Sequence, residues 1–122
     1  MRVLVCGGRT FGLNLSESSF INNTLDELLL RRAIQEPHII TGGARGVDTI
    51  ANDWARHRGL SYVIYLADWN KYGKRAGYIR NKQMLDEGKP DLVVAFPGGN
   101  GTAMMVDISK KAGVEVIQVE QR

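Results

Sequence analysis

Three glycine-rich segments each follow a short apolar run, a pattern that favours anion binding. They are "CGGRTFG" (6–12), "TGGARGVD" (41–48) and "PGGNGT" (97–102). Glycine allows close backbone approach, and a helix that starts after such a loop offers unpaired N–H groups and the positive end of its dipole. The candidate residues for holding a phosphate or carboxylate in these loops are Gly7, Gly8, Arg9, Thr10, Gly42, Gly43, Arg45, Gly46, Asp48, Pro97, Gly98, Gly99, Gly101 and Thr102.

Some of these candidates also have a purely structural interpretation. A tight turn between a strand and a helix needs glycine for its geometry alone. Asp48 stands at the start of a predicted helix, where a carboxylate offsets the helix dipole. Thr102 caps the last predicted helix if its side-chain oxygen accepts a backbone N–H. Because three such loops are expected at one sheet edge, we still predict a phosphate-bearing ligand.

Arginine and aromatic side chains near the loops extend the candidate site. Arg9, Arg45 and Arg80 can each bind a phosphate or carboxylate through two N–H groups. Trp69 and Tyr72 follow the third apolar run in "ADWNKYGKRAG", where an aromatic face either stacks on a base or covers core side chains. The lysines and arginine of this segment make it basic, as expected for a loop that closes over a charged ligand.

Other kinds of site find little support in the sequence. No glycine loop continues as "GK[ST]", and none is a "GxGxxG" loop with an acidic residue at the ribose-binding distance, which argues against P-loop NTPases and Rossmann dehydrogenases. The single cysteine, Cys6, cannot form an internal disulfide, and His38 and His57 lack metal-site spacing. We therefore expect no metal and no cofactor, and a buried Cys6 that is not a nucleophile.

The elements that must position these residues follow from the apolar pattern. Short β-branched runs occur at residues 2–6, 38–41, 61–67, 91–96 and 114–119. Most are too continuous for strands with one face in water, which predicts buried parallel strands. Apolar residues at helical spacing predict helices over 17–34 and 46–58 and, more weakly, 76–87, with Gly59, Gly88 and Gly113 at helix ends.

This alternation predicts a single α/β domain over residues 1–122. Its expected core is a Rossmann-like, doubly wound parallel sheet of about five strands with helices on both faces. In such a sheet a ligand binds beyond the carboxyl ends of the strands, where the strand order reverses.

Most of the chain from Thr41 onward resembles a known family. The segments "TGGARGVDTIANDWA", "ADWNKYGKRAGYIRNKQML" and "PDLVVAFPGGNGTAMMV" occur in this order, and "CGGRTF" precedes them. In these segments the chain is similar to the small stand-alone YspA-like branch of the SLOG superfamily. That superfamily includes the Lonely Guy phosphoribohydrolases, the DNA-processing protein A fold and sensor domains for nucleotides related to ADP-ribose and NAD. The resemblance implies a Rossmann-like fold and a nucleotide-derived ligand on the glycine loops, but no single activity.

The resemblance to Lonely Guy enzymes extends to some residues and fails at others. Those enzymes cleave the N-glycosidic bond of nucleoside monophosphates with an Arg in an "RKxxM"-like helix and a Glu just after "PGGxGT". Here "RNKQM" supplies Arg80 at the Arg position, with Asn81 in place of the lysine, and both become candidate ligand-binding residues. Ala-Met-Met (103–105) stands where that family places its acidic pair. The carboxylate that such cleavage needs is missing there, which leaves Asp48 and Asp107 as catalytic candidates beside Arg80.

Three classes of function remain. The preferred interpretation is a receptor or sequestering protein for a nucleotide-derived small molecule, such as an ADP-ribose-related, NAD-related or cyclic nucleotide signal. The first alternative is a nucleotide hydrolase of the phosphoribohydrolase or N-glycosidase kind. The second is a single-stranded nucleic-acid binder, suggested by the net charge of +3 and the resemblance to DNA-processing protein A.

The sequence also gives expectations about location and assembly. No apolar run reaches the length of a membrane span, and the apolar start is shorter than a signal-peptide core. We expect a cytoplasmic protein without membrane contact. Because this fold commonly self-associates through its helical faces, we also expect a homodimer or a higher homo-oligomer.

Overall fold

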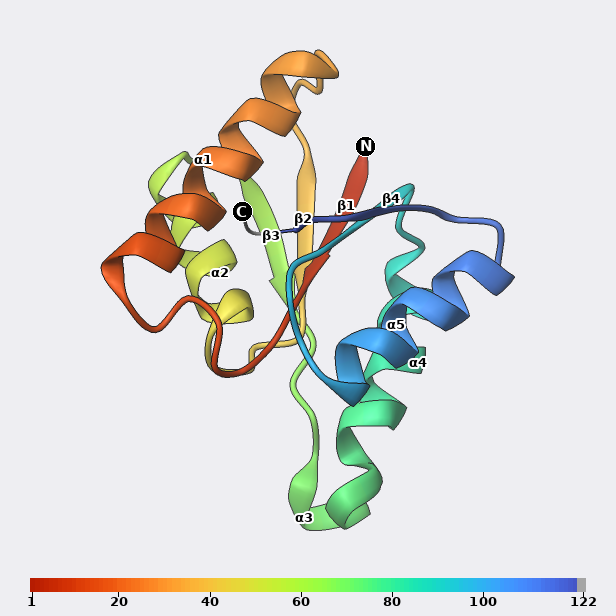
Figure 1. Cartoon of the computed structure of the whole chain (residues 1–122). Helices are drawn as coiled ribbons and strands as arrows, with labels where there is room; N and C mark the ends of the chain where they lie inside the picture. The colour runs from red at the N-terminus through yellow and green to blue at the C-terminus, as the bar shows by residue number, and fades with distance from the viewer. Residues whose placement is uncertain (121–122) are drawn as a thin grey trace.

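Five parallel strands form one sheet in the computed structural model, which describes residues 1–120 (Figure 1). The strands are β1 (Arg2–Cys6), β2 (His38–Thr41), β3 (Ser61–Ile64), β4 (Leu92–Ala95) and β5 (Glu115–Gln118). Their order across the sheet is β3-β2-β1-β4-β5. The chain builds outward from β1 to β3 and then returns to the other side of β1. This confirms the doubly wound, Rossmann-like sheet, with its reversal of strand order between β1 and β4.

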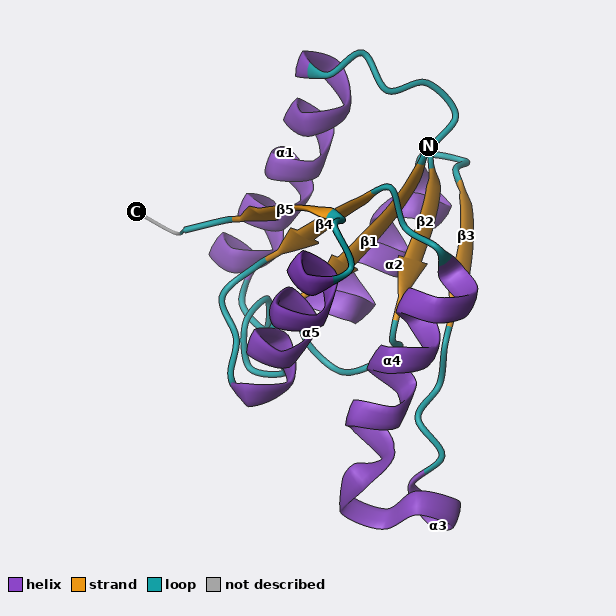
Figure 2. Ribbon diagram, turned by 90° about the vertical axis from the view of Figure 1, so that its right-hand side faces the viewer, coloured by secondary structure: helices purple, strands orange, loops and turns teal. Residues whose placement is uncertain are grey.

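Helices cover both faces of this sheet. The helices α1 (Leu15–Arg31) and α2 (Val47–His57) lie on one face, and α4 (Ala76–Gly88) and α5 (Asn100–Lys111) lie on the other (Figure 1). The short α3 (Trp69–Tyr72) and the 3-10 turn η1 (Gly73–Arg75) connect β3 to α4. Figure 2 shows α3 extending beyond the carboxyl ends of the strands. This places α3 at the edge where the ligand is expected.

Alternate residues of the central strands supply two separate cores. Val3 and Val5 of β1 pack on the side of α1 and α2, whereas Leu4 and Cys6 pack on the side of α4 and α5. Side chains alternate between the two faces of a strand, so a strand covered on both faces is apolar throughout. This explains the continuous apolar runs of β1 and β4, which are buried along nearly their whole length.

The two edge strands differ from the predicted buried strands. β3 and β5 are partly or fully exposed at every residue, because each pairs with a single neighbouring strand. The strand predicted over 61–67 is also shorter and ends at Ile64. The residues that follow it leave the sheet and lead to α3.

Capping sets the start of α1. The side-chain oxygen of Asn14 accepts a hydrogen bond from the backbone N–H of Glu17 at 2.8 Å. The helix therefore begins at Leu15, two residues before the predicted start, and it ends at Arg31 rather than at residue 34.

Glycine lies at the ends of three helices, as predicted. Gly59 and Gly113 follow the C-caps of α2 and α5 with positive φ. Gly88 likewise lies at a helix end, as predicted, because it is the last residue of α4. Lys89 takes the left-handed conformation there, with φ of 47°.

Candidate ligand-binding site

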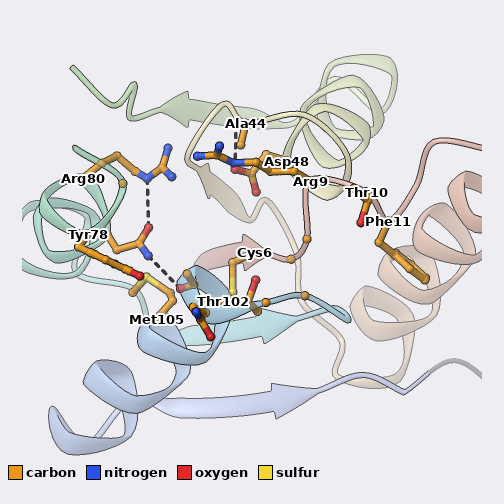
Figure 3. Close-up of a pocket in the computed structure, with 18 of the residues that line it drawn as sticks. Cys6, Arg9, Thr10, Phe11, Ala44, Asp48, Tyr78, Arg80, Thr102 and Met105 are labelled. Atoms are coloured by element: carbon orange, nitrogen blue, oxygen red, sulfur yellow. Dashed lines mark hydrogen bonds between the residues drawn. The ribbon is translucent and has the colours of Figure 1, made fainter. Parts of the chain in front are cut away.

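A cavity of about 680 Å³ lies at the carboxyl ends of β1 and β4, where the strand order reverses (Figure 3). The predicted residues that line it are Gly7, Gly8, Arg9, Thr10, Asp48, Trp69, Arg80, Asn81, Pro97, Gly98, Gly99, Gly101 and Thr102. The loops after β1 and β4 therefore form one site. The α2 helix adds Asp48 to it, α3 adds Trp69, and α4 adds Arg80.

The loop after β2 contributes less than the sequence predicts. The candidates Gly42, Gly43, Arg45 and Gly46 are not part of the cavity wall. The carbonyl of Gly42 accepts a hydrogen bond from Arg80 instead, and a Cβ at Gly42 would overlap the guanidinium. Arg45 is exposed, so its side chain is not held in the site. Only Asp48 and Ala44 of this loop line the cavity.

Two other candidates also lie outside the cavity wall. Tyr72 is exposed on α3, with the Lys71 Nζ 5.1 Å from its ring centroid. Asp107 is exposed on α5, and its carboxylate lies 3.0 Å from the Nζ of Lys111. The structure therefore does not bring Asp107 to the position of the carboxylate that is missing after "PGGNGT".

Sequence reasoning missed several residues of the cavity wall: Cys6, Phe11, Glu17, Ala44, Gly77, Tyr78, Met84, Asn100 and Met105. Helical spacing could have found three of them. Gly77 and Met84 lie three residues before and four residues after Arg80, on the same face of α4. Met105 likewise lies three residues after Thr102 on α5. The others come from the end of β1, from loops or from helix starts, where no periodic pattern indicates them.

The start of α5 has the features of an anion site. Gly99 is its N-cap residue, and within residues 1–120 no side chain caps this helix, whereas Asn14 and Asp68 cap α1 and α3. A Cβ at Gly99 or Gly101 would meet nothing within 4 Å. The fold does not require glycine at these two positions. Their missing side chains leave open space beside the unpaired N–H groups of the first turn.

Thr102 does not cap α5 as the sequence suggested. The helix begins at Asn100, so Thr102 lies inside its first turn. A Cβ at Gly98 would overlap the Thr102 hydroxyl. The Thr102 side chain therefore lies against the Gly98 backbone, at the wall of the cavity.

Other glycines of the site serve the packing of one loop on another. The backbone N–H of Gly8 donates to the carbonyl of Pro97 at 2.8 Å. A Cβ at Gly8 would lie 3.0 Å from both the Pro97 carbonyl oxygen and the Gly98 Cα. The structural interpretation therefore holds for Gly8 and Gly98, whereas Gly99 and Gly101 remain free for a ligand.

A chain of hydrogen bonds joins α4 to the start of α5 (Figure 3). The Nε of buried Arg80 donates to the Asn81 Oδ1 at 3.0 Å, and its Nη1 donates to the Gly42 carbonyl. The Nδ2 of Asn81 in turn donates to the Gly101 carbonyl at 3.1 Å. Because the Asn81 amide is used within the protein, its role is to position the first turn of α5. Arg80 keeps further N–H groups, and it lines the cavity.

Asp48 is a buried carboxyl group in the cavity wall. Only 6% of the residue is exposed, and its Oδ2 accepts a hydrogen bond from the Ala44 N–H at 3.1 Å (Figure 3). Burial raises the pKa of Asp48 to about 6, although the Ala44 hydrogen bond and the charges of Arg80 and Arg9 oppose this shift. A carboxyl group with such a pKa can both hold and release a proton near neutral pH.

Cys6 lies in the same cavity wall, and its thiol is expected to be unreactive. The residue is 8% exposed at the end of β1. Burial raises the pKa of its thiol far above the usual range, and the charge of Asp48 adds to this effect. The thiol therefore stays protonated at neutral pH and is a poor nucleophile.

The stability gained by Asp48→Asn should depend on pH. The pKa of Asp48 rises from an ordinary value of 3.8 to about 6 on folding, so the folded state binds this proton more tightly than the unfolded state. The free energy of unfolding of the wild type therefore falls as pH rises from 3.8 to about 6. The loss is about 3 kcal/mol for a shift of about two pKa units. The Asn variant lacks this loss. Urea unfolding should show its advantage growing from about pH 4 to about pH 8, and a difference that is constant with pH would contradict the assignment.

Aromatic and basic side chains surround the mouth of the cavity. The guanidinium carbon of Arg9 lies 5.0 Å from the centroid of the Trp69 ring, a cation–π contact between the β1 loop and α3. Trp69 and Tyr78 are each 46% exposed, and Lys74 lies beside them in the wall. Tyr78, rather than the predicted Tyr72, joins Trp69 as an exposed aromatic ring of the site, whereas Phe11 in the same wall is buried. A planar base can stack on either exposed ring face.

Comparison with known proteins identifies the family. The model of the YspA, cpYpsA-related SLOG family matches residues 1–72, which contain the β1 loop, Asp48 and Trp69. The chain belongs to this family. The SLOG chain is also 36% identical over 123 residues to the Gene 61 protein of Mycobacterium phage D29, covering 95% of this chain and 94% of that relative. The resemblance inferred from the sequence is therefore confirmed.

The solved structure of TM1055 supports the fold of this SLOG chain. The crystal structure of TM1055, a Northeast Structural Genomics Consortium target, matches with a TM-score of 0.72 at 23% identity, covering 94% of this chain and 71% of that chain. A predicted subunit of tRNA methyltransferase from Methanocaldococcus jannaschii matches with a TM-score of 0.42 at 15% identity, over 97% of this chain and 67% of that chain. The match to TM1055 agrees with the Rossmann-like sheet described above.

Two further features of the SLOG chain concern metal binding and membranes. Over residues 1–120, no three His, Cys, Asp or Glu side chains come close enough together to hold a metal ion. None of the helices in the same residues is both long and apolar enough to cross a membrane.

Proposed function

We propose that this SLOG chain binds a nucleotide-derived small molecule in the cavity between the β1 and β4 loops and acts as a receptor or sequestering protein. The observation that carries the proposal is the open space at Gly99 and Gly101, beside a helix start that no described side chain caps. A phosphate fits this position because it accepts several N–H hydrogen bonds and is favoured by the helix dipole. The aromatic rings of Trp69 and Tyr78 then offer stacking surfaces for the base.

The choice of a receptor over an enzyme rests on the residues that follow the phosphate loop. Ala103, Met104 and Met105 stand in α5 where a carboxylate would face the sugar in the resembling hydrolases. Met104 accepts a weak contact from the Asn81 amide, with Nδ2 and Sδ 3.6 Å apart, and Met105 is fully buried. These side chains neither stabilise a cationic sugar nor activate water. We therefore expect the protein to bind its nucleotide ligand without cleaving it.

The test is a binding panel with recovery of each ligand. AMP, ADP, ADP-ribose, NAD, cyclic ADP-ribose, a cyclic dinucleotide and a short single-stranded DNA are each added in a thermal unfolding experiment. A ligand at about 100 times its Kd stabilises the folded state by about 2.7 kcal/mol, which gives a clear rise in the unfolding midpoint. We expect a nucleotide to bind and to be recovered intact by chromatography. Stabilisation by the DNA alone, weakening steeply with salt, would favour the nucleic-acid binder instead.

A hydrolase remains the second candidate because of one observation, the buried Asp48 carboxyl in the cavity wall with its pKa of about 6. If any panel ligand is recovered as base and sugar phosphate, Asp48 is the expected general acid or base, with Arg80 beside the developing charge. Asp48→Asn should then lower turnover by about 100-fold or more while binding persists. Asp107→Asn is the matched control outside the cavity. Equal loss of turnover in both variants would exclude a specific role of Asp48.

A further inference from the structure

We infer that Asp48 binds the sugar hydroxyl groups of the ligand while the start of α5 holds its phosphate, so that the site selects ribose over deoxyribose. This inference rests on the proposed function and adds to it the chemical feature that the site recognises. The inference has three requirements. Asp48 must have acceptor positions free for a ligand, and its charge must disfavour a phosphate beside it. Its distance from the proposed phosphate position must be one that a sugar can span.

The first requirement concerns the free acceptor sites of Asp48. The side chain lines the cavity, and Oδ2 accepts the Ala44 N–H at 3.1 Å. The Gly42 backbone also lies close to the carboxylate and acts to lower its pKa. An ionised carboxylate has about four acceptor positions, so about two remain for hydroxyl donors of a ligand. Two neighbouring hydroxyl groups, as on the ribose ring, fit this acceptor capacity.

The second requirement concerns charge. Asp48 and a phosphate repel each other, and burial in the wall makes water a poor screen between them. The charges of Arg80 and Arg9 act on the Asp48 carboxyl group and offset part of this repulsion, while two of the Arg80 N–H groups are used by Gly42 and Asn81. A neutral donor avoids this repulsion and is drawn to the carboxylate by a charge-assisted hydrogen bond. The ligand should therefore turn its phosphate toward α5 and its hydroxyl groups toward Asp48.

The third requirement concerns distance. The loops after β2, β1 and β4 are neighbours because their strands are neighbours in the sheet. Adjacent strands lie about 4.8 Å apart, so about 10 Å separates the exit of β2, next to Asp48, from the exit of β4, next to Gly98. A sugar phosphate that lies across the β1 loop spans such a gap. In this loop, Gly8 packs its backbone against Pro97 and Gly98 and has no side chain that would stand between the two positions.

The experiment compares ribose and dideoxyribose ligands by isothermal titration calorimetry. The probes are AMP and ADP with their 2′,3′-dideoxy counterparts, and the proteins are the wild type, Asp48→Asn and Asp53→Asn. Asp53→Asn is the matched control, because Asp53 is an exposed carboxylate of the same helix that pairs with Arg56. Wild type and control should bind the ribose form about 10- to 100-fold more tightly than the dideoxy form, as expected for hydrogen bonds to a charged acceptor. In Asp48→Asn the ribose form should weaken until the two forms differ by about twofold at most.

The outcomes separate this inference from the proposed function. Equal binding of ribose and dideoxy forms by the wild type would overturn the inference and leave the proposed function standing. A full ribose preference in a folded Asp48→Asn variant would assign the discrimination to another residue and would likewise overturn it. If neither AMP, ADP nor any other nucleotide of the panel binds, the proposed function fails and the inference fails with it.

Discussion

Gly99→Asp should abolish the binding of phosphate-bearing ligands and leave the fold intact. The new carboxylate would occupy the open space at the N-cap of α5, where the proposed phosphate lies. It would repel that phosphate and compete for the same N–H groups. Gly99 has φ of −101°, which lies outside the left-handed region that favours glycine. We expect the affinity for the best nucleotide of the panel to fall by at least about 100-fold, since both charge and hydrogen bonds are lost.

The same substitution should have the opposite effect on stability. Aspartate is a better N-cap residue than glycine by a few tenths of a kcal/mol, and its charge adds about 0.3–1 kcal/mol through the helix dipole. Thermal unfolding without ligand should therefore show an unchanged or slightly higher midpoint. Lost binding together with retained stability distinguishes a blocked site from a damaged fold.

Gly99→Asn is the matched control for the charge. Asparagine has nearly the same size and also caps helices, but it does not repel a phosphate. Calorimetry should rank wild type above Gly99→Asn and Gly99→Asn above Gly99→Asp in affinity. A folded Gly99→Asp variant that binds as tightly as the wild type would show that this loop is only a turn.

The sequence predicts the fold and much of the site, because both depend on local patterns. The continuous apolar runs identify β1 and β4 as buried central strands, and glycine after each strand marks the loops that meet at the cavity. The sequence does not show that the strand order reverses between β1 and β4, because the order of strands in a sheet depends on tertiary contacts. The sequence predicts too long a strand at β3, because Leu66, which follows the strand and is exposed, is as apolar as a core residue.

The roles of the polar residues could not be read from sequence, because they depend on contacts between distant segments. Arg80 is held by Gly42, which lies 38 residues earlier in the chain. Asn81 is a predicted ligand contact, in place of a lysine in the resembling enzymes, yet its amide donates to the Gly101 carbonyl. Asp48 was weighed mainly as a dipole-compensating residue, and only its burial in the cavity wall raises its pKa and gives it further chemistry.

The glycines illustrate the same limit, since one residue type serves two purposes in this site. Where a Cβ would overlap a neighbouring loop, as at Gly8 and Gly46, glycine is required by the fold. Where a Cβ would meet nothing, as at Gly99 and Gly101, glycine leaves room for a ligand. Substitutions in the first group should therefore act on stability, and those in the second on binding.

Gly46→Ala is expected to cause the largest loss of stability among these changes. Gly46 precedes α2 with φ of 77° and ψ of −125°, a conformation that is essentially restricted to glycine. A Cβ there would overlap the Gly8 carbonyl oxygen and lie 2.7 Å from that of Phe11. Backbone strain and overlap with two backbone carbonyls together should lower the free energy of unfolding by about 3 kcal/mol or more.

Gly113→Ala is the matched control, because it changes the backbone freedom without the overlap. Gly113 has φ of 79°, and a Cβ there would meet nothing within 4 Å. Its cost should be about 1 kcal/mol, the penalty of a left-handed conformation alone. Urea unfolding of both variants measures the difference in the free energy of unfolding. Equal losses would mean that the β1 loop moves at little cost to accommodate a side chain at Gly46. A large loss at Gly46 alone would show that the start of α2, and with it Asp48, is held in place by the same loop that lies under the proposed ligand.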